Sequence, residues 1–175
     1  MKKEVSVDYL CNERENQYFD RKSARIKPTE VARHLVAFSN ANGGILAIGI
    51  EDNGTITGFN YNKANSINDF LYVPFSCCHG NLMIETEIIN VNGKQILLFF
   101  IDSVENNVIK TSDNKVYLRI GDKSKLLTHN EITQLEYDKG DRSFEDLVIK
   151  DSSFDDVDIE LLLKYNMLFQ KLLKK

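Results

Sequence analysis

The sequence predicts an α+β fold, in which a mixed, mainly antiparallel sheet carries a packed central helix, two short helices and a C-terminal helix. Three observations support this prediction. Residues 15–59 read as strand, helix, glycine turn, strand, acidic turn and strand. Residues 83–101 form two apolar runs joined by Asn-Gly, a strong hairpin signal. The end of the chain has the composition of a helix, acidic at its start and basic at its finish.

The central helix is expected over residues 29–41. It follows Pro28, a residue favoured at the first helical position. Glycine at 43 and 44 can take the left-handed conformation that ends a helix. One face is apolar, because three residues recur at i, i+4 and i+7: Val31, Leu35 and Phe38.

Strands are expected on both sides of this helix. The first covers residues 17–22, and the second is the apolar run 45–50, typical of a strand that is covered on both faces. Residues 51–54 form a turn that contains Asn-Gly, and 55–58 return as the next strand.

The remaining segments are shorter. Residues 1–12 are expected to be an arm whose alternating residues could add an edge strand. Thr128 and Glu131 have the spacing of a capping box that opens a helix. The other expected elements are a helix at 66–73 broken by Pro74, a loop at 75–82, strands at 83–91, 94–101, 108–111 and 116–120, and a helix at 130–137.

The composition is that of an ordinary globular protein. Of the 175 residues, 42% are hydrophobic and 27% are charged. No apolar run approaches the roughly 20 residues of a membrane span, and the N-terminus lacks the apolar core of a signal peptide. We therefore expect a cytoplasmic protein without membrane contact. The three cysteines have no C-x-x-C spacing, which argues against a disulfide framework and a zinc site.

Charge is unevenly distributed and indicates a division of the chain. Residues 136–160 hold ten acids and three bases, whereas the whole chain has a net charge of −4, so the remainder is mildly basic at +3. Such asymmetry is consistent with a nucleic-acid face on the basic part, or simply with a solvated acidic surface. We expect a domain at 1–138, followed at 139–175 by an acidic linker and a C-terminal helix.

The expected C-terminal helix, residues 154–175, is apolar nearly all round. A helix of this kind needs burial on several sides. It could pack on the body of the protein, on a second copy or on further domains. A homo-oligomer formed through this helix is therefore one expected partnership.

The centre of the chain resembles a known family. Glu15, Asp20 and Lys22 precede the run AFSNANGGILAIGIEDNGTITGF at 37–59, and KVYLRIGD follows at 115–122. Together they are similar to the Schlafen-type AlbA domain, whose pattern is E-x-x-x-x-E-x-K followed by the glycine-rich run. The resemblance implies a DNA-binding domain of bacterial transcriptional regulators. Two positions depart from the pattern: Asp20 replaces a glutamate, and Arg21 replaces an aromatic or apolar residue.

Three carboxylates are candidate metal ligands: Glu15, Asp20 and Asp52. If the first two strands are neighbours, these groups could converge, and oxygen ligands suit Mg²⁺ or Mn²⁺. In some Schlafen-type proteins the matching acids serve metal-dependent RNA cleavage, so the resemblance implies catalytic roles for them if the protein is a nuclease. The structural alternative is that Asp52 makes the turn, while Asp20 pairs with Lys22 or Arg25.

Basic residues offer a candidate strip for phosphate contacts, which would give affinity without reading sequence. The strip is Arg21, Lys22, Arg25, Lys27, Arg33, Lys115, Arg119, Lys123 and Lys125. The glycine turn is a candidate phosphate cradle because bare backbone amides can approach an anion. Its residues are Asn40, Asn42, Gly43 and Gly44. The alternative for the turn is a helix C-cap, since a phosphate loop precedes a helix and this one follows it.

The leading hypothesis is a nucleic-acid-binding domain of a transcriptional regulator, with DNA, or else RNA, as the partner and no cofactor required. One alternative is a ribonuclease that depends on Mg²⁺ or Mn²⁺. A second alternative is a protein–protein assembly module driven by the C-terminal helix. An enzyme is the less favoured class.

Overall fold

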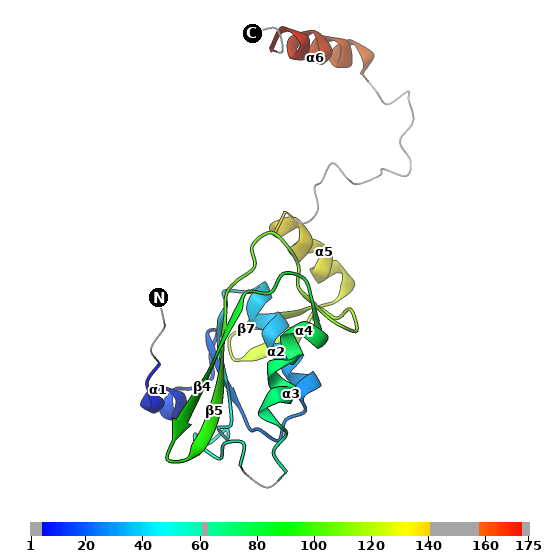
Figure 1. Cartoon of the computed structure of the whole chain (residues 1–175). Helices are drawn as coiled ribbons and strands as arrows, with labels where there is room; N and C mark the ends of the chain where they lie inside the picture. Colours follow the sequence, from blue (N-terminus) through cyan, green and yellow to red (C-terminus); the bar gives the residue numbers. More distant parts are fainter. Residues whose placement is uncertain (1–4, 61–62, 141–157, 173–175) are drawn as a thin grey trace. The chain divides into compact units, whose positions relative to one another are not determined.

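The computed structural model describes residues 5–60, 63–140 and 158–172 (Figure 1). The chain divides into two compact units, Met1–Arg142 and Ser143–Lys175. The helices of the first unit are α1 (Val7–Asn12), α2 (Pro28–Asn40), α3 (Ile67–Leu71), α4 (Val73–Ser76) and α5 (His129–Asp138). Its strands are β1 (Phe19–Lys22), β2 (Gly44–Ile48), β3 (Cys78–His79), β4 (Ile84–Val91), β5 (Lys94–Ile101), β6 (Lys110–Thr111), β7 (Tyr117–Ile120) and β8 (Lys123–Leu126). The second unit holds α6 (Ile159–Leu172).

The main sheet has four strands in the order β1-β2-β5-β4. β1 and β2 run parallel, with Phe19 opposite Ile45, and α2 makes the crossover between them. β5 runs antiparallel to both β2 and β4. The sheet is therefore mixed and mainly antiparallel, and the α+β class predicted from the sequence is confirmed.

The two faces of this sheet carry separate apolar clusters, because successive side chains of a strand point to opposite faces. Along β2, Leu46 and Ile48 join the larger cluster, whereas Ala47 joins the smaller one. The larger cluster packs under α2, α3 and α4, and the smaller one packs under α1 through Leu10. Figure 1 shows these helices on opposite sides of the sheet.

Two further pairs of strands complete the first unit. β7 and β8 form an antiparallel hairpin beside α2, and β3 pairs antiparallel with β6. A third apolar cluster lies between this region and α5. Its buried members are Val108, Val116 and Leu127. The hairpin brings residues from late in the chain against the helix that follows β1.

The turn between α2 and β2 requires glycine for two reasons. The backbone N–H of Gly43 donates to the carbonyl of Phe38 and ends the helix, with Gly43 at φ +72°. A Cβ atom on Gly43 would also lie 2.5 Å from the carbonyl oxygen of Ile101 on the adjacent strand. Any side chain here would therefore be strained and would push the helix away from the sheet.

Several sequence predictions were wrong in detail. The expected edge strand near the N-terminus is the helix α1, where the Ser6 side chain accepts the N–H of Tyr9 as an N-cap. Residues 55–58 contribute only an isolated bridge, between Ile50 and Ile56, rather than a strand. Pro74 lies in the first turn of α4, where a missing N–H costs nothing, so the chain continues in a helix.

Two strands, β3 and β8, fall where none was predicted. In the C-terminal part, α6 lies within the predicted helix, while residues 141–157 and 173–175 lie outside the described part of the chain. No helix of the described ranges is long and apolar enough to cross a membrane.

Candidate functional site

A buried polar centre lies where β1, α2 and the β7–β8 hairpin meet. We use this name for Asp20, Lys22, His34 and Arg119. Asp20 is 1% exposed and Arg119 is 2% exposed, so both charges are removed from water. Groups of this kind are stable inside a protein only when they are paired and hydrogen-bonded.

Asp20 is the acceptor at which the other three side chains meet. Its Oδ1 accepts from Lys22 Nζ at 2.5 Å, and its Oδ2 accepts from Arg119 Nη1 at 2.6 Å. His34 Nδ1 lies 3.3 Å from the same Oδ2. Burial opposes ionisation of Asp20, but the hydrogen bond from His34 and the charge of Lys22 outweigh it and hold the pKa well below its usual range. Asp20 is therefore an ionised structural hub.

Arg119 has partners on every side of its guanidinium group. Nε and Nη2 donate to the backbone carbonyl of Asn16 at 3.1 Å and 2.8 Å, and Nη2 also donates to that of Phe19 at 3.2 Å. The group lies over the ring of Phe38, with 4.7 Å between Cζ and the ring centroid. Arg119 thus holds the hairpin against β1 and α2, and it has no donor directed to solvent.

The surroundings of His34 resemble a catalytic triad in composition but not in geometry. Ser124 Oγ and Asp20 Oδ2 both meet Nδ1, at 3.2 Å and 3.3 Å, whereas Nε2 accepts from Arg33 Nε at 3.2 Å. A relay needs the serine on one ring nitrogen and the carboxylate on the other. Burial lowers the pKa of His34, and the adjacent Asp20 opposes this only in part. His34 is therefore a neutral residue that links α2 to β8.

Glu15 and Lys22 form the more accessible rim of the polar centre. Lys22 Nζ lies 2.9 Å from Glu15 Oε1 as well as 2.5 Å from Asp20. Burial and the neighbouring Asp20 raise the pKa of Glu15, and Lys22 acts in the opposite direction. The structure thus brings Glu15 and Asp20 together around an ammonium group.

Asp52 does not join the other two candidate ligands. It is exposed in the turn after β2, where Asn53 Oδ1 accepts the N–H of Thr55 and shapes the loop. Among the described residues, no three His, Cys, Asp or Glu side chains are arranged to hold a metal ion. The residues therefore do not fit a three-carboxylate metal centre, and metal-dependent RNA cleavage stays an untested prediction.

The predicted basic strip separates into buried and exposed members. Arg21 is buried and donates to the carbonyls of Leu10, Cys11 and Glu13, so it anchors α1 to β1. Arg25 pairs with Glu51 at 2.6 Å. Together with Lys22 and Arg119, these side chains are occupied by protein partners.

The exposed members surround α2 and the hairpin. Lys115 pairs with Asp113 at 2.7 Å and Lys125 pairs with Glu131 at 2.5 Å. Lys27, Arg33 and Lys123 are exposed and have no carboxylate partner within the described ranges. We call the exposed group the basic face: Lys27, Arg33, Lys115, Lys123 and Lys125.

The candidate phosphate cradle has a structural use in this fold. Asn40 is buried, and its amide donates to the carbonyls of Ile109 and Tyr117 at 2.8 Å and 3.0 Å. Its Oδ1 accepts the N–H of Ile109 at 2.8 Å. Asn40 therefore connects the end of α2 to the segment 109–117 by hydrogen bonds. The sequence pattern did not predict this contact.

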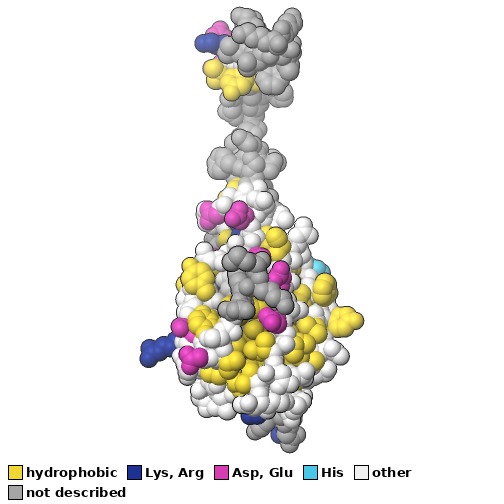
Figure 2. All heavy atoms as spheres, turned by 60° about the vertical axis from the view of Figure 1, so that its left-hand side comes forward, with side chains coloured by type: hydrophobic (Ala, Val, Ile, Leu, Met, Phe, Trp, Pro, Cys, Tyr) yellow, Lys and Arg dark blue, Asp and Glu magenta, His cyan; other side chains and the backbone are white. Residues whose placement is uncertain are grey.

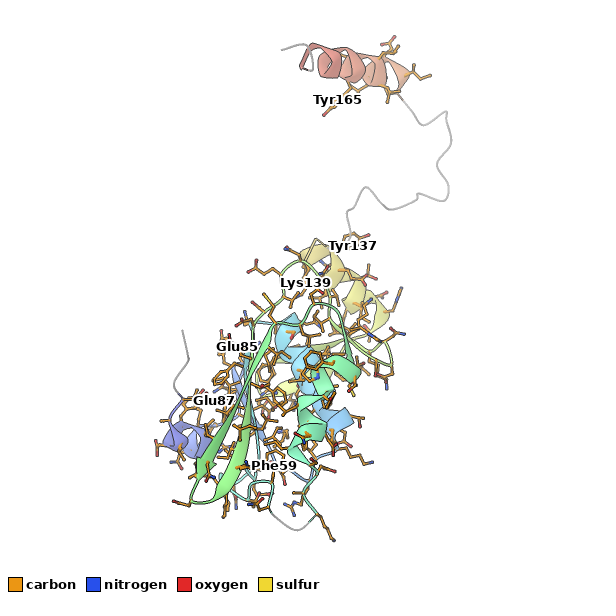
Figure 3. All side chains as sticks on the ribbon, viewed as in Figure 1. Phe59, Glu85, Glu87, Tyr137, Lys139 and Tyr165 are labelled. Atoms are coloured by element: carbon orange, nitrogen blue, oxygen red, sulfur yellow. The ribbon has the colours of Figure 1, made fainter. Side chains whose placement is uncertain are left out.

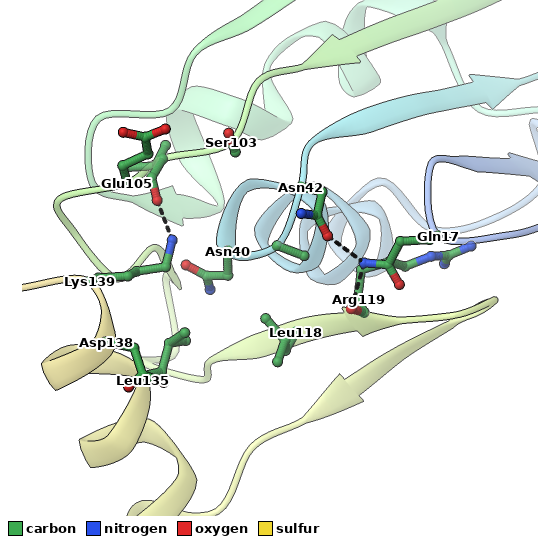
Figure 4. Close-up of a pocket in the computed structure, with 12 residues that line it drawn as sticks. Gln17, Asn40, Asn42, Ser103, Glu105, Leu118, Arg119, Leu135, Asp138 and Lys139 are labelled. Atoms are coloured by element: carbon green, nitrogen blue, oxygen red, sulfur yellow. Dashed lines mark hydrogen bonds between the residues drawn. The ribbon is translucent and has the colours of Figure 1, made fainter.

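A pocket of about 510 Å³ opens beside this turn (Figure 4). Gln17 spans one side, where its Nε2 donates to Asn42 Oδ1 at 3.2 Å and to the Arg119 carbonyl at 3.0 Å. Across the pocket, Lys139 Nζ donates to the carbonyl of Val104. The cations that line the pocket thus bind the protein itself, and amides and the leucines at 118 and 135 form much of the remaining wall.

Comparisons with known proteins add to this geometry. Among solved structures, the chain is similar to the DIP2311 protein from Corynebacterium diphtheriae, with a TM-score of 0.51 and 18% identity over 70% of this chain and 24% of that chain. It is also similar to the N-terminal domain of a RecG-related protein from Nitrosomonas europaea, with a TM-score of 0.46 and 20% identity over 72% of this chain and 97% of that one. The chain thus spans only about a quarter of the length of the DIP2311 protein. No curated protein matches it.

The family comparison covers most of the first unit. A family model described as Schlafen, AlbA_2 matches residues 15–128, from Glu15 to the N-cap of α5. This range contains the buried polar centre and the glycine turn. The chain therefore belongs to the Schlafen AlbA_2 family.

Proposed function

We propose that this domain binds nucleic acid through phosphate contacts on its basic face, as the DNA-binding part of a transcriptional regulator. The resemblance of residues 37–59 and 115–122 to AlbA-type domains supports the proposal, because it implies nucleic-acid binding. The glycine-rich run at 37–59, the most specific part of the resemblance, forms the end of α2, the turn and β2. We therefore look for the binding residues among the exposed cations.

The observation that carries the proposal is a hollow lined by both Arg33 and Lys115. Its volume is about 310 Å³, and it lies between α2 and the turn after β6. The hydroxyl residues Thr29, Thr111 and Ser112 line it as well. The Thr111 hydroxyl is already hydrogen-bonded to Asp113 and the Lys115 carbonyl. The two cations and the hydroxyl groups of Thr29 and Ser112 suit a phosphate, which takes hydrogen bonds from both kinds of donor.

Cations beyond the hollow extend this surface. Lys27 occupies the N-cap position of α2, and Lys123 and Lys125 lie on β8 on either side of Ser124, which contacts His34 of α2. These exposed cations add positive charge around the hollow for further phosphates of a strand. Affinity gained in this way depends on salt and is largely independent of base sequence.

Carboxylates close to the basic face limit its affinity. Glu30 and Asp113 line the same hollow, and Asp113 already pairs with Lys115. A phosphate would have to compete with Asp113 for this lysine. We expect affinities in the micromolar range or weaker at physiological salt, as for non-specific binding.

Another face of the unit has a different character. Figure 2 shows mainly apolar and acidic side chains there, with Lys or Arg at its left and lower margins. Glu85 and Glu87 project from the edge strand β4 (Figure 3). Phosphate would be repelled from Glu85 and Glu87, which favours the α2 and β7–β8 side as the proposed binding face.

The test is a titration of fluorescent single- and double-stranded DNA and RNA with the full chain at several salt concentrations. The double variant Arg33→Ala/Lys115→Ala should weaken binding to all sequences alike. Its slope of log affinity against log salt should fall by about 2 on a duplex, because two phosphate contacts are lost.

A matched control is Lys94→Gln, which removes an exposed lysine at the β4–β5 hairpin, away from the basic face. It should leave affinity and salt slope close to those of the wild type. Equal salt slopes for the double variant and the wild type would overturn the assignment to this face. If none of the four probes, single- or double-stranded DNA or RNA, bound the protein, the proposed function would be overturned.

A further inference from the structure

We infer that α6 is a self-association element, which pairs antiparallel with α6 of a second copy of this chain. The inference concerns the second unit alone and does not rest on the proposed nucleic-acid binding. It starts from the exposure of the helix. Its apolar side chains from Ile159 to Tyr165 are between 57% and 72% exposed: Ile159, Leu161, Leu162, Leu163 and Tyr165. Figure 3 shows Tyr165 projecting from the helix.

The sequence of α6 has the spacing of a helix–helix seam. Leu162, Tyr165, Phe169 and Leu172 follow one another at intervals of three, four and three residues. This is the a/d pattern by which two helices interlock. Leu161 and Leu168 immediately precede two of these positions and widen the apolar face.

The charged residues of α6 share another stripe. At 100° per residue, Glu160, Lys164 and Lys171 fall within one narrow sector, opposite the seam defined by Leu162 and Phe169. Glu160 and Lys164 also have the i, i+4 spacing and order that stabilise a helix surface. α6 thus carries one charged stripe opposite the seam, while apolar residues occupy most of the rest of its surface.

A helix of this length needs a partner. An isolated helix shorter than about 12–15 residues is marginal in water, and α6 has 14. Burial of the seam against a second helix would remove apolar surface from water and so supply the missing stabilisation.

Charge identifies the partner and its direction. Asp158 and Glu160 stand at the start of α6, whereas Lys171 lies in its last turn and Lys174 and Lys175 follow in the sequence. The helix therefore has an acidic and a basic end. An antiparallel second copy brings each acidic end beside a basic end and also opposes the two helix dipoles. A parallel copy would place acid against acid and lysine against lysine.

The expected dimer is of moderate strength. A helix of 14 residues is about 21 Å long, so the seam contains only two heptads. The full chain should therefore pass from one to two copies as its concentration rises, and sedimentation equilibrium measures this change in mass directly.

The first experiment removes the seam. The variant Leu162→Asn/Tyr165→Asn should stay at the mass of one chain over the range in which the wild type doubles. Lys164→Gln, on the charged stripe, is the matched control and should dimerise as the wild type does. Near-ultraviolet circular dichroism and the melting temperature check that the first unit is folded in each variant.

The second experiment determines direction. In a reversed chain, Asp158 and Glu160 become lysine, and Lys171, Lys174 and Lys175 become glutamate. Antiparallel pairing predicts that this chain forms homodimers but does not mix with the wild type, because mixed pairs bring like charges together. Native mass spectrometry of tagged chains separates the species. Preferred mixed dimers would mean parallel pairing and would overturn the antiparallel inference.

Two results would overturn self-association itself. One is a single-chain mass for the wild type at every concentration tested. That result would overturn self-association whether or not α6 binds anionic lipid vesicles, the alternative partner for its apolar face. The other is an unchanged mass curve for Leu162→Asn/Tyr165→Asn, which would put the contact between copies elsewhere.

Discussion

Asp20 on β1 and Arg119 on β7 form a buried ion pair, with 2.6 Å between Asp20 Oδ2 and Arg119 Nη1. The two residues lie 99 positions apart in the chain. Arg119 also binds the carbonyls of Asn16 and Phe19, so one side chain connects the hairpin to the beginning of the sheet. The family match covers residues 15–128, so this ion pair joins a residue near its beginning to one near its end.

Breaking this ion pair should be costly. Asp20→Asn and Arg119→Met should each lower the free energy of unfolding by about 3–5 kcal/mol. The first leaves buried Arg119 without a carboxylate, and the second leaves buried Asp20 with only Lys22 and His34. The double variant should lose less than the sum of the two, since neither charge then remains. Urea unfolding measures all three. Asp52→Asn, in the exposed turn, is the control and should change stability little; additive losses in the double variant would argue against a direct coupling.

Stability should depend on pH through His34. Its pKa is lowered in the folded protein from the usual value of 6.5. As the pH falls below 6.5, the unfolded chain binds a proton at this position before the folded chain does, so the folded state loses stability. Urea unfolding between pH 7.5 and 5.5 should show this loss in the wild type and a smaller one in His34→Gln. His79→Gln, at an exposed site, should keep the wild-type dependence; a loss of equal size in His34→Gln would assign the effect to other groups.

Divalent metal should not stabilise the protein. Lys22 already bridges Glu15 and Asp20, Arg119 pairs with Asp20, and Asp52 lies apart in its turn, so a cation would have to displace the ammonium group. We expect equal melting temperatures with Mn²⁺ and with a chelator. A rise with Mn²⁺ that Asp52→Asn removes would contradict this expectation and favour the ribonuclease alternative, as would a gain of Mn²⁺-dependent RNA cleavage in Asp20→Glu.

The two asparagines of the glycine turn should behave differently. Asn40→Ala leaves the buried N–H of Ile109 and two carbonyls without partners, at a cost of about 1–3 kcal/mol for each unsatisfied group. Asn42 is exposed, so Asn42→Ala should cost much less. Thermal unfolding compares the two. If the turn instead binds phosphate, Asn42→Ala would weaken nucleic-acid binding while stability stays unchanged.

Local patterns were sufficient for the central elements of the fold. Pro28, the apolar spacing of α2 and the glycine pair predict the helix to within one residue at each end. The Asn92-Gly93 signal predicts the hairpin, and the strand Lys94–Ile101 has the predicted bounds. These features depend on neighbours in sequence, which is why sequence alone can reveal them.

The buried polar centre could not be predicted in the same way. The sequence suggested a pair between Asp20 and Lys22, which the structure contains, but gave no sign that Arg119 and His34 would join it. Arg21 was predicted to lie on the surface because it belongs to a basic run. In the structure its side chain is buried and donates to the carbonyls of Leu10 and Cys11 in α1. Whether a cation is buried depends on tertiary packing, which cannot be predicted from a run of charged residues in the sequence.

The connection between Asp20 and Arg119 has a consequence for biosynthesis. Asp20, Lys22 and His34 leave the ribosome long before Arg119, so the growing chain contains the carboxylate well before its deepest partner. Until β7 is made, closing the sheet over α2 would bury an incompletely paired charge. The four-stranded sheet should therefore stay loosely packed during synthesis and become rigid only when the hairpin arrives, which makes any fragment that ends before residue 119 a target for proteolysis.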